Sequence, residues 1–260
     1  MNQFAGDKAS DAPWQVLYSV GGVAALAAGV LFRRNIAAEL ELLVERPSPV
    51  SVGDWFALLQ SQRLLGLAYL NVFDLVNYVL VGVMFLALYV LLGRVCRSEM
   101  AIATMLVLIG VTVYVASNTS LSMLSLSDQY VAATTDAQRT RLLAAGEALL
   151  AMSRFTNPSA APGTGGYVSL LFIAIASMMA SRAMLRSGAF NRATGYVGLL
   201  AGALDVGYCV AFATVPQVDG GHLALVFIPA AGLFWMVWHM MVGWRLYQLG
   251  RRLASIGETP

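Results

Sequence analysis

The sequence predicts an all-α, polytopic membrane protein: a bundle of six transmembrane helices with two amphipathic interfacial connector segments. Three observations predict this class. Hydrophobic residues form 58% of the 260-residue chain, charged residues form only 12%, and the mean hydropathy is +0.70. A soluble domain carries roughly 25% charged residues to cover its surface. This composition therefore requires lipid around most of the chain.

Six stretches are long and apolar enough to cross a bilayer, which takes about 20 helical residues. They are approximately Trp14–Phe32, Leu64–Leu92, Met100–Ser117, Tyr167–Leu185, Ala193–Val215 and His222–Tyr247. We expect the first to be a retained signal anchor, because Lys8 is balanced by Asp7 and Asp11 and the apolar run is too long for a signal peptide. The predicted organisation is an N-terminal tail (1–13), one transmembrane domain (14–248) and a C-terminal tail (249–260).

The first connector, residues 33–63, ends in an amphipathic segment. Its Trp55 and Leu59 fall on one helical face and its Gln60 and Ser61 on the other. That pattern is typical of a short helix lying in the membrane interface. It favours a connector that caps the bundle over one that forms a separate domain.

The second connector, residues 125–163, contains another helical block. Thr135 followed by Gln138 is a capping-box sequence, which marks a helix start. An apolar stripe at helical spacing follows, made of Leu142, Leu143, Leu149 and Leu150. Asn157-Pro158 then interrupts the helix before the fourth span. We expect this connector to be a second interfacial cap.

Orientation depends on the distribution of Lys and Arg, which are enriched in cytoplasmic loops. With both termini in the cytoplasm, the cytoplasmic side holds nine of the sixteen Lys and Arg residues and the outer side holds seven. Arg33-Arg34, directly after the first span, favours the opposite orientation. On the overall count we expect cytoplasmic N- and C-termini.

Several functional classes lack their sequence signatures. The net charge is +2 with no basic patch, so no nucleic-acid partner is expected. Lys8 is the only lysine, which leaves no intramembrane lysine for a retinal-type Schiff base. The chain has no CxxC, HExxH, GxSxG or P-loop motif, and no second histidine stands at metal-ligand spacing. We therefore expect neither a metal nor a cofactor.

Two acidic residues lie within predicted spans and are the strongest functional candidates. A carboxylate at the centre of a transmembrane helix costs about 2.5–3.5 kcal/mol, so such groups face the bundle interior and find a partner. Asp74 belongs to a polar stripe with Asn71 and Tyr78. Asp205 follows Gly198-x-x-x-Gly202, which allows a neighbouring helix to approach closely.

The spacing predicts similar membrane depths for these two acids. Asp74 lies about ten residues after the start of its predicted span and Asp205 about ten residues before the end of its own, which places both about 15 Å from the same membrane face. Asn118 ends span three on the same side. We therefore predict a shared ligand or proton pocket formed by Asp74, Asn77, Tyr78, Asn118, Asp205 and Tyr208. The alternative is structural: the acids lock helices together through hydrogen bonds.

Three further residues are weaker candidates. Asn71 extends the polar stripe around Asp74. Glu147 is expected on the water-exposed face of an interfacial helix. His239 is expected to pack among Trp235 and Trp238. None of them has a partner at catalytic or metal-ligand spacing in the sequence. We expect structural roles for Glu147 and His239.

Three stretches resemble a bacterial integral-membrane family, domain of unknown function 4386. They are Asp74-Leu75-Val76-Asn77-Tyr78 running on to Phe85–Tyr89, Leu126–Tyr130 leading into Arg141–Glu147, and Arg186-Ser187-Gly188 through Asn191-Arg192 to Gly198. The resemblance covers most of the chain and implies a six-helix bundle in a bacterial cytoplasmic (inner) membrane. It implies no activity, substrate or functional residue.

Three functions stay open at this point. The sequence favours the first, which is non-enzymatic: the bundle binds a lipid or small apolar ligand, or serves as an accessory subunit of a membrane complex. The second is a proton-coupled small-molecule transporter that uses Asp74 and Asp205. The third is an intramembrane hydrolase or transferase that uses two of Asp74, Asp205, Glu147 and His239. Membrane lipids are the expected partners, and a protein partner or a homo-oligomer is left open.

Overall fold

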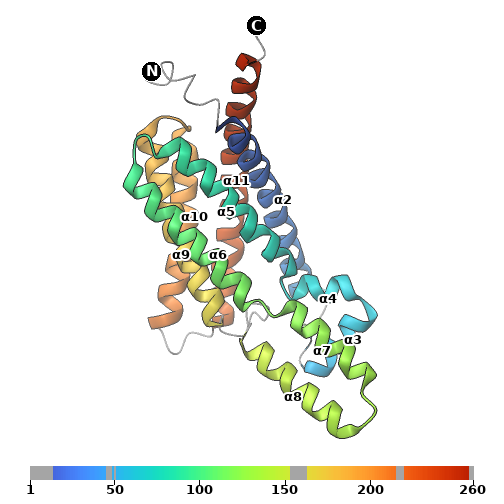
Figure 1. Cartoon of the computed structure of the whole chain (residues 1–260). Coiled ribbons are helices and arrows are strands. Elements are labelled where there is room, and N and C mark those ends of the chain that lie inside the picture. Colours follow the sequence, from blue (N-terminus) through green and yellow to red (C-terminus); the bar gives the residue numbers. More distant parts are fainter. Residues whose placement is uncertain (1–13, 45–48, 50, 153–162, 215–219, 258–260) are drawn as a thin grey trace.

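The computed structural model describes residues 14–44, 49, 51–152, 163–214 and 220–257, and every regular element within these ranges is an α-helix. Six long helices form an elongated bundle, and four shorter ones pack together at one of its ends (Figure 1). The long helices are α2 (Gln15–Val44), α5 (Val72–Leu92), α6 (Arg97–Ser117), α9 (Thr164–Ser187), α10 (Arg192–Thr214) and α11 (Gly220–Gly257). The shorter ones, which we call the cap, are α3 (Val52–Ser61), α4 (Arg63–Tyr69), α7 (Ser120–Ala132) and α8 (Asp136–Met152).

Consecutive long helices run in opposite directions along the bundle (Figure 1). Short turns at residues 93–96 and 188–191 join α5 to α6 and α9 to α10, and turns this short make neighbouring helices antiparallel. Helix α2 therefore begins, and α11 ends, at the end of the bundle opposite the cap, which we call the terminal end. Helix α11 packs along α2 and α10, and α9 packs along α6 and α10.

Five segments of the described chain are long and apolar enough to cross a membrane: Gln15–Phe32, Val72–Leu92, Arg97–Ala132, Thr164–Ser187 and Arg192–Thr214. The protein is therefore a multi-pass helical membrane protein. The sixth predicted span, His222–Tyr247, lies in α11. This helix packs within the bundle, and its passage across the membrane stays a prediction.

The predicted single span Leu64–Leu92 is wrong. The structure divides it into α4 and α5, separated by Leu70 and Asn71. Asn71 has a φ of 59°, in the left-handed region, which ends one helix and lets the next begin in a new direction. Asparagine adopts this conformation more readily than most side chains, so the break occurs without a glycine or proline.

Other helix boundaries also differ from the predicted ones. Helix α2 continues twelve residues beyond Phe32 to Val44, so it includes part of the first connector. Helix α7 begins at Ser120, before the predicted start of the second connector at residue 125. Helix α11 continues to Gly257, into the predicted C-terminal tail. Packing supports two of these extensions, since Ser120 and Met123 of α7 are buried and Leu253 of α11 packs against the bundle core.

Close contact between α2 and α11 depends on glycine. A Cβ atom at Gly22 would lie 2.9 Å from the Tyr247 Cα atom, and one at Gly243 would lie 2.8 Å from the Leu26 backbone nitrogen. Both distances are shorter than any normal contact between a Cβ atom and a non-bonded atom, so only glycine lets the two backbones approach this closely. Lipid supplies no hydrophobic driving force between helices, and close backbone packing of this kind replaces it.

The two connectors fold against each other to make the cap, which has its own apolar core of Val52, Trp55, Phe56, Leu59, Leu70 and Met123. Arg63 forms a 2.7 Å ion pair with Asp128, and Gln60 donates a 2.9 Å hydrogen bond to the Ser127 hydroxyl. These contacts attach α3 and α4 to α7. That the cap lies in the membrane interface stays a prediction.

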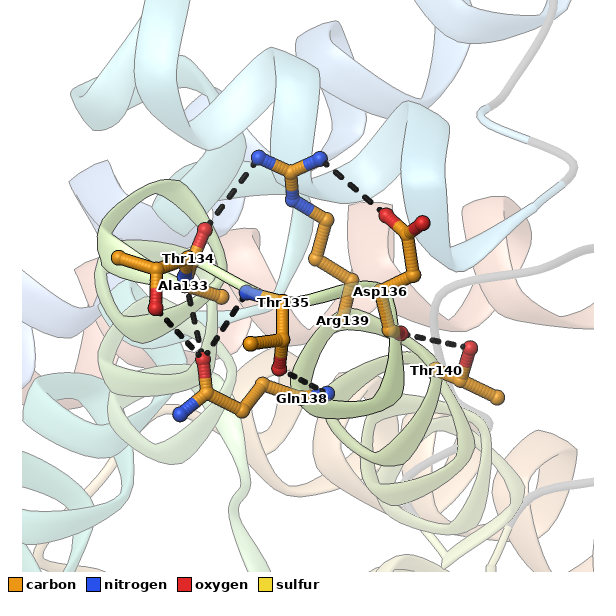
Figure 2. Close-up of polar contacts among 7 residues, drawn as sticks. All are labelled: Ala133, Thr134, Thr135, Asp136, Gln138, Arg139 and Thr140. Atoms are coloured by element: carbon orange, nitrogen blue, oxygen red, sulfur yellow. Dashed lines mark hydrogen bonds and ion pairs between the residues drawn. The ribbon is translucent and has the colours of Figure 1, made fainter.

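The predicted capping box at the start of α8 is confirmed. Figure 2 shows the turn between α7 and α8, where the Gln138 backbone N–H donates to Thr135 Oγ1 over 3.3 Å. In return, the Thr135 backbone N–H donates to Gln138 Oε1 over 3.2 Å. Helix α3 starts in the same way, with Ser51 and Asp54 exchanging hydrogen bonds. Both cap helices thus begin at positions fixed by local side chains.

Candidate functional site

Asp74 lies in the first turn of α5, where the bundle meets the cap. The Tyr114 hydroxyl on α6 donates a 3.4 Å hydrogen bond to Asp74 Oδ2. The unsatisfied backbone N–H groups of a helix N-terminus also favour a negative charge there. Asp74 is therefore held by α6 and by its own helix start, at the cap end of the bundle.

Tyr78, one turn further along α5, stacks on Tyr114. Their ring centroids are 3.8 Å apart with an interplanar angle of 13°. Because positions 74 and 78 share a helical face, both side chains of α5 meet the same tyrosine of α6.

Asp205 is deep in the bundle, on α10, and is 7% exposed. The indole Nε1–H of Trp235, on α11, donates a 2.7 Å hydrogen bond to Asp205 Oδ2. Gly202, one turn before it, contacts α9, because a Cβ there would lie 2.8 Å from the Ala174 carbonyl oxygen. Helix α10 therefore presents Asp205 to a helix–helix interface, as its glycine spacing predicts.

Asn118 joins the site from the end of α6. Its side-chain oxygen accepts a 3.0 Å hydrogen bond from the Ser120 backbone N–H, and its amide donates to the Asn71 carbonyl oxygen over 3.5 Å. Tyr114, one turn earlier, also hydrogen bonds with the Asn118 side chain. Asn118 thus connects the α6–α7 turn to the tyrosine that holds Asp74.

A small cavity of about 20 Å³ lies beside these groups. Its lining residues come from the starts of α5 and α9 and the ends of α6 and α8: Leu70, Asn71, Tyr114, Ser117, Asn118, Thr119, Met152, Gly163 and Gly166. A volume of roughly 10–15 Å³ is enough for one water molecule when polar partners surround it. This cavity therefore has room for a single water between the cap and the tyrosine pair.

Three of the six predicted pocket residues are brought together, because Asp74, Tyr78 and Asn118 all interact with Tyr114. The described side-chain contact of Asp205 is instead with Trp235 on α11. Asn77 is 2% exposed, and its Oδ1 atom has no hydrogen-bond partner among the described residues. Tyr208 is buried and stacks on Phe212, at a centroid distance of 6.3 Å. No described contact connects Asn77 or Tyr208 to the other four residues.

The predicted equal depth of the two acids is wrong. Asp74 is two residues from the start of α5, or about 3 Å along the helix. Asp205 is nine residues from the end of α10, or about 14 Å. The prediction counted from Leu64, but the break at Asn71 moves the helix start to Val72. Asp74 is thus nearer the cap, and Asp205 is nearer the middle of the bundle.

Tyr114 and Trp235 are the site residues that sequence reasoning missed. Tyr114 stands one turn before Asn118, on the same face of its helix, and this spacing to a predicted site residue was the available signal. Trp235 had no comparable signal, because tryptophan is common in transmembrane helices as an apolar and interfacial residue. Its role depends on which helix packs against Asp205.

The weaker candidates lie apart from this cluster or at its edge. Asn71 lines the small cavity. Glu147 is exposed on α8 of the cap. His239 is 1% exposed, its Nδ1 atom is 2.8 Å from the Trp235 carbonyl oxygen, and its ring packs against Phe32. Within the described residues, no three His, Cys, Asp or Glu side chains form a group that would hold a metal ion.

Comparison with known proteins gives one match. The family model described as "Domain of unknown function (DUF4386)" matches residues 15–244, which include five of the six long helices, the whole cap and α11 up to residue 244. No curated protein and no solved structure matches the chain. The resemblance seen in the sequence is therefore confirmed: the chain belongs to the family of domain of unknown function 4386.

Proposed function

We propose that this membrane protein is a proton-coupled small-molecule transporter in which Asp74 and Asp205 bind and release the coupling protons. One observation carries the proposal: the carboxyl group of Asp205 is buried between two long helices of the bundle, where a neutral indole on α11 donates to it. Acidic residues inside a membrane bundle are typical of proton relays in pumps and transporters.

The surroundings of Asp205 support proton exchange. Its described hydrogen-bond donor, the Trp235 indole, is neutral, and the carboxyl group is buried. A buried carboxylate without a cationic partner gains little from staying charged, so protonation is an accessible way to neutralise it. Asp205 is thus suited to carry a proton that arrives or leaves as the bundle changes conformation.

The hydrogen bonds offer a way to couple protonation to movement. A bond from Trp235 to a charged Asp205 is stronger than one to a neutral carboxyl group. Protonation therefore weakens the link between α10 and α11, and protonation of Asp74 similarly weakens the link between α5 and α6. Each protonation event thus favours separation of a different helix pair. Alternating access needs such a shift between conformations that open to the two sides of the membrane.

Proteoliposomes with an imposed pH gradient test this proposal. For each small molecule of a panel, electrical recording measures the charge movement across the proteoliposome membrane. Wild type is compared with Asp74→Asn and Asp205→Asn. We expect both variants to fold and to lose proton-driven flux. The matched control is Asp136→Asn, an exposed cap residue 3.7 Å from Arg139, which should behave as wild type. Proton-driven flux that survives in Asp205→Asn would contradict the proposal.

A second candidate is binding of a lipid or small apolar ligand, or an accessory role in a membrane complex. It is favoured by large apolar side chains exposed on the cap and at its junction with the bundle: Leu64 at 78%, Leu121 at 60%, Val131 at 63% and Met152 at 63%. Native mass spectrometry of the purified protein tests it. Retention of a ligand or subunit that is lost in Leu64→Gln/Val131→Gln would support this candidate, and its retention in that variant would contradict it.

The third function, an intramembrane hydrolase or transferase, has less support from the geometry. Glu147 lies on the exposed face of α8, and His239 Nδ1 contacts the Trp235 backbone. Both placements favour structural roles for these two side chains. Asp74 and Asp205 then remain, and their separation along the bundle suits proton transfer better than chemistry at one shared atom.

A further inference from the structure

The terminal end of the bundle carries a concentration of positive charge. Its arginines are Arg94, Arg97, Arg182, Arg186, Arg192, Arg245, Arg251 and Arg252, and Glu99 is the acid found there among the described residues. At the cap end, by contrast, Arg63 pairs with Asp128 and Arg139 with Asp136. Among the described residues, arginines therefore outnumber acidic residues at the terminal end but not on the cap.

Two of these arginines, Arg182 and Arg186, meet where α6 contacts α9. Glu99 accepts hydrogen bonds from Arg186 over 2.8 Å and from Arg182 over 3.2 Å, which draws the two guanidinium groups together. Both arginines stay largely exposed, at 51% and 59% of their side chains. Two positive charges thus share one negative charge at the ends of two membrane-spanning helices.

Below this cluster, α6 presents an apolar face to its surroundings. The exposed residues Ile102 (47%), Met105 (54%) and Ile109 (40%) follow one another at helical spacing. Glu99 lies one turn before Ile102, so the arginines that it binds are at the upper end of this face. The segment from Glu99 to Ile109 extends about 15 Å along the helix, a length suited to an acyl chain beneath a headgroup.

We propose that this surface binds an anionic phospholipid, with its phosphate group at Arg182 and Arg186 and an acyl chain along Ile102, Met105 and Ile109. Charge complementarity selects the occupant: two arginines and one glutamate leave an excess of one positive charge, which a net-negative lipid neutralises and a zwitterionic lipid does not. Guanidinium groups also bind phosphate oxygens through paired N–H donors. This site is separate from Asp74 and Asp205 and does not depend on the proposed transport.

Native mass spectrometry of protein from micelles with equal phosphatidylglycerol and phosphatidylcholine tests the proposal. We expect wild type to retain phosphatidylglycerol several-fold over phosphatidylcholine, less so at high salt. Arg182→Gln/Arg186→Gln should reduce that preference at least about fivefold. The matched control is Arg139→Gln/Arg141→Gln on the cap, which should retain the preference. Equal retention of both lipids by wild type, or an equal loss in the control, would overturn the proposal.

Glu99→Gln separates lipid binding from a purely structural ion pair. It removes the competing carboxylate and keeps both arginines, so we expect the preference for phosphatidylglycerol to rise. If the arginines serve only to pair with Glu99, this variant lowers thermal stability without raising lipid preference, and the proposal fails. Inorganic phosphate should not displace the lipid. Displacement would indicate a soluble phosphate ligand and would also overturn the proposal.

Discussion

Trp235 donates a 2.7 Å hydrogen bond to Asp205 and thereby links α11 to α10 inside the bundle. Both side chains are buried, at 5% and 7% exposure. A buried hydrogen bond to a carboxyl group is costly to break, because the group left behind has neither water nor protein as a partner. This pair is therefore the contact on which both the packing of α10 and the proposed proton exchange depend.

Trp235→Phe should lower the free energy of unfolding by about 1–3 kcal/mol, the usual cost of leaving a buried polar group unsatisfied. The aromatic ring remains, so the loss reflects mainly the missing indole N–H. The measurement is denaturant or thermal unfolding in detergent. Trp244→Phe, at an exposed position on the same helix, is the control. Unchanged stability of Trp235→Phe would show that this hydrogen bond does not support the fold.

Gly22→Ala should destabilise the bundle by about 1–3 kcal/mol, as expected for overpacking. The added methyl group would lie 2.9 Å from the Tyr247 Cα atom and push α2 away from α11. Gly53→Ala is the control, because the nearest atom to its methyl group would be Ser51 Oγ at 3.6 Å. Thermal unfolding of both variants is the measurement, and equal melting temperatures would contradict the close α2–α11 contact.

Thr135→Ala should weaken the start of α8 by about 0.5–2 kcal/mol, the usual effect of removing an N-cap side chain. Hydrogen exchange at the backbone amides of Asp136 to Arg139 measures this locally, and we expect faster exchange there. Thr140→Ala is the matched control, because the Thr140 hydroxyl only bonds back to the Asp136 carbonyl oxygen (Figure 2). Faster exchange in both variants would mean that the capping box has no special role.

An even number of spans should place both chain termini on the same side of the membrane. Reporter fusions at the two ends, read in intact cells, measure this directly, and we expect both reporters to be cytoplasmic. Termini on opposite sides would show that α11 does not cross. Two external termini would keep the six spans and overturn the predicted orientation.

Much of the fold could be predicted from the sequence because lipid imposes simple rules on it. In lipid, backbone N–H and C=O groups must form their hydrogen bonds within their own helix, so a long apolar stretch predicts a membrane-spanning helix. The break at Asn71 could not be read in this way, since the residues on both sides of it are apolar. A hydropathy pattern does not reveal that an asparagine adopts the left-handed backbone conformation.

The candidate site was predictable only in part, for a related reason. Charged residues in a span are conspicuous, so Asp74 and Asp205 were identifiable at once. Their partners depend on which helices pack together, and Tyr114 and Trp235 come from helices that are 40 and 30 residues away in sequence. Tyrosine and tryptophan are also ordinary membrane residues. Their functional positions become visible only in three dimensions.

Infrared difference spectroscopy across a pH titration tests the central claim most directly, because it detects the protonated carboxyl group of a buried aspartate. Wild type in lipid should show a carboxyl band that changes with pH, and Asp205→Asn should lack that change while keeping the helical amide signal. An identical pH-dependent band in wild type and Asp205→Asn would contradict the claim that Asp205 exchanges a proton.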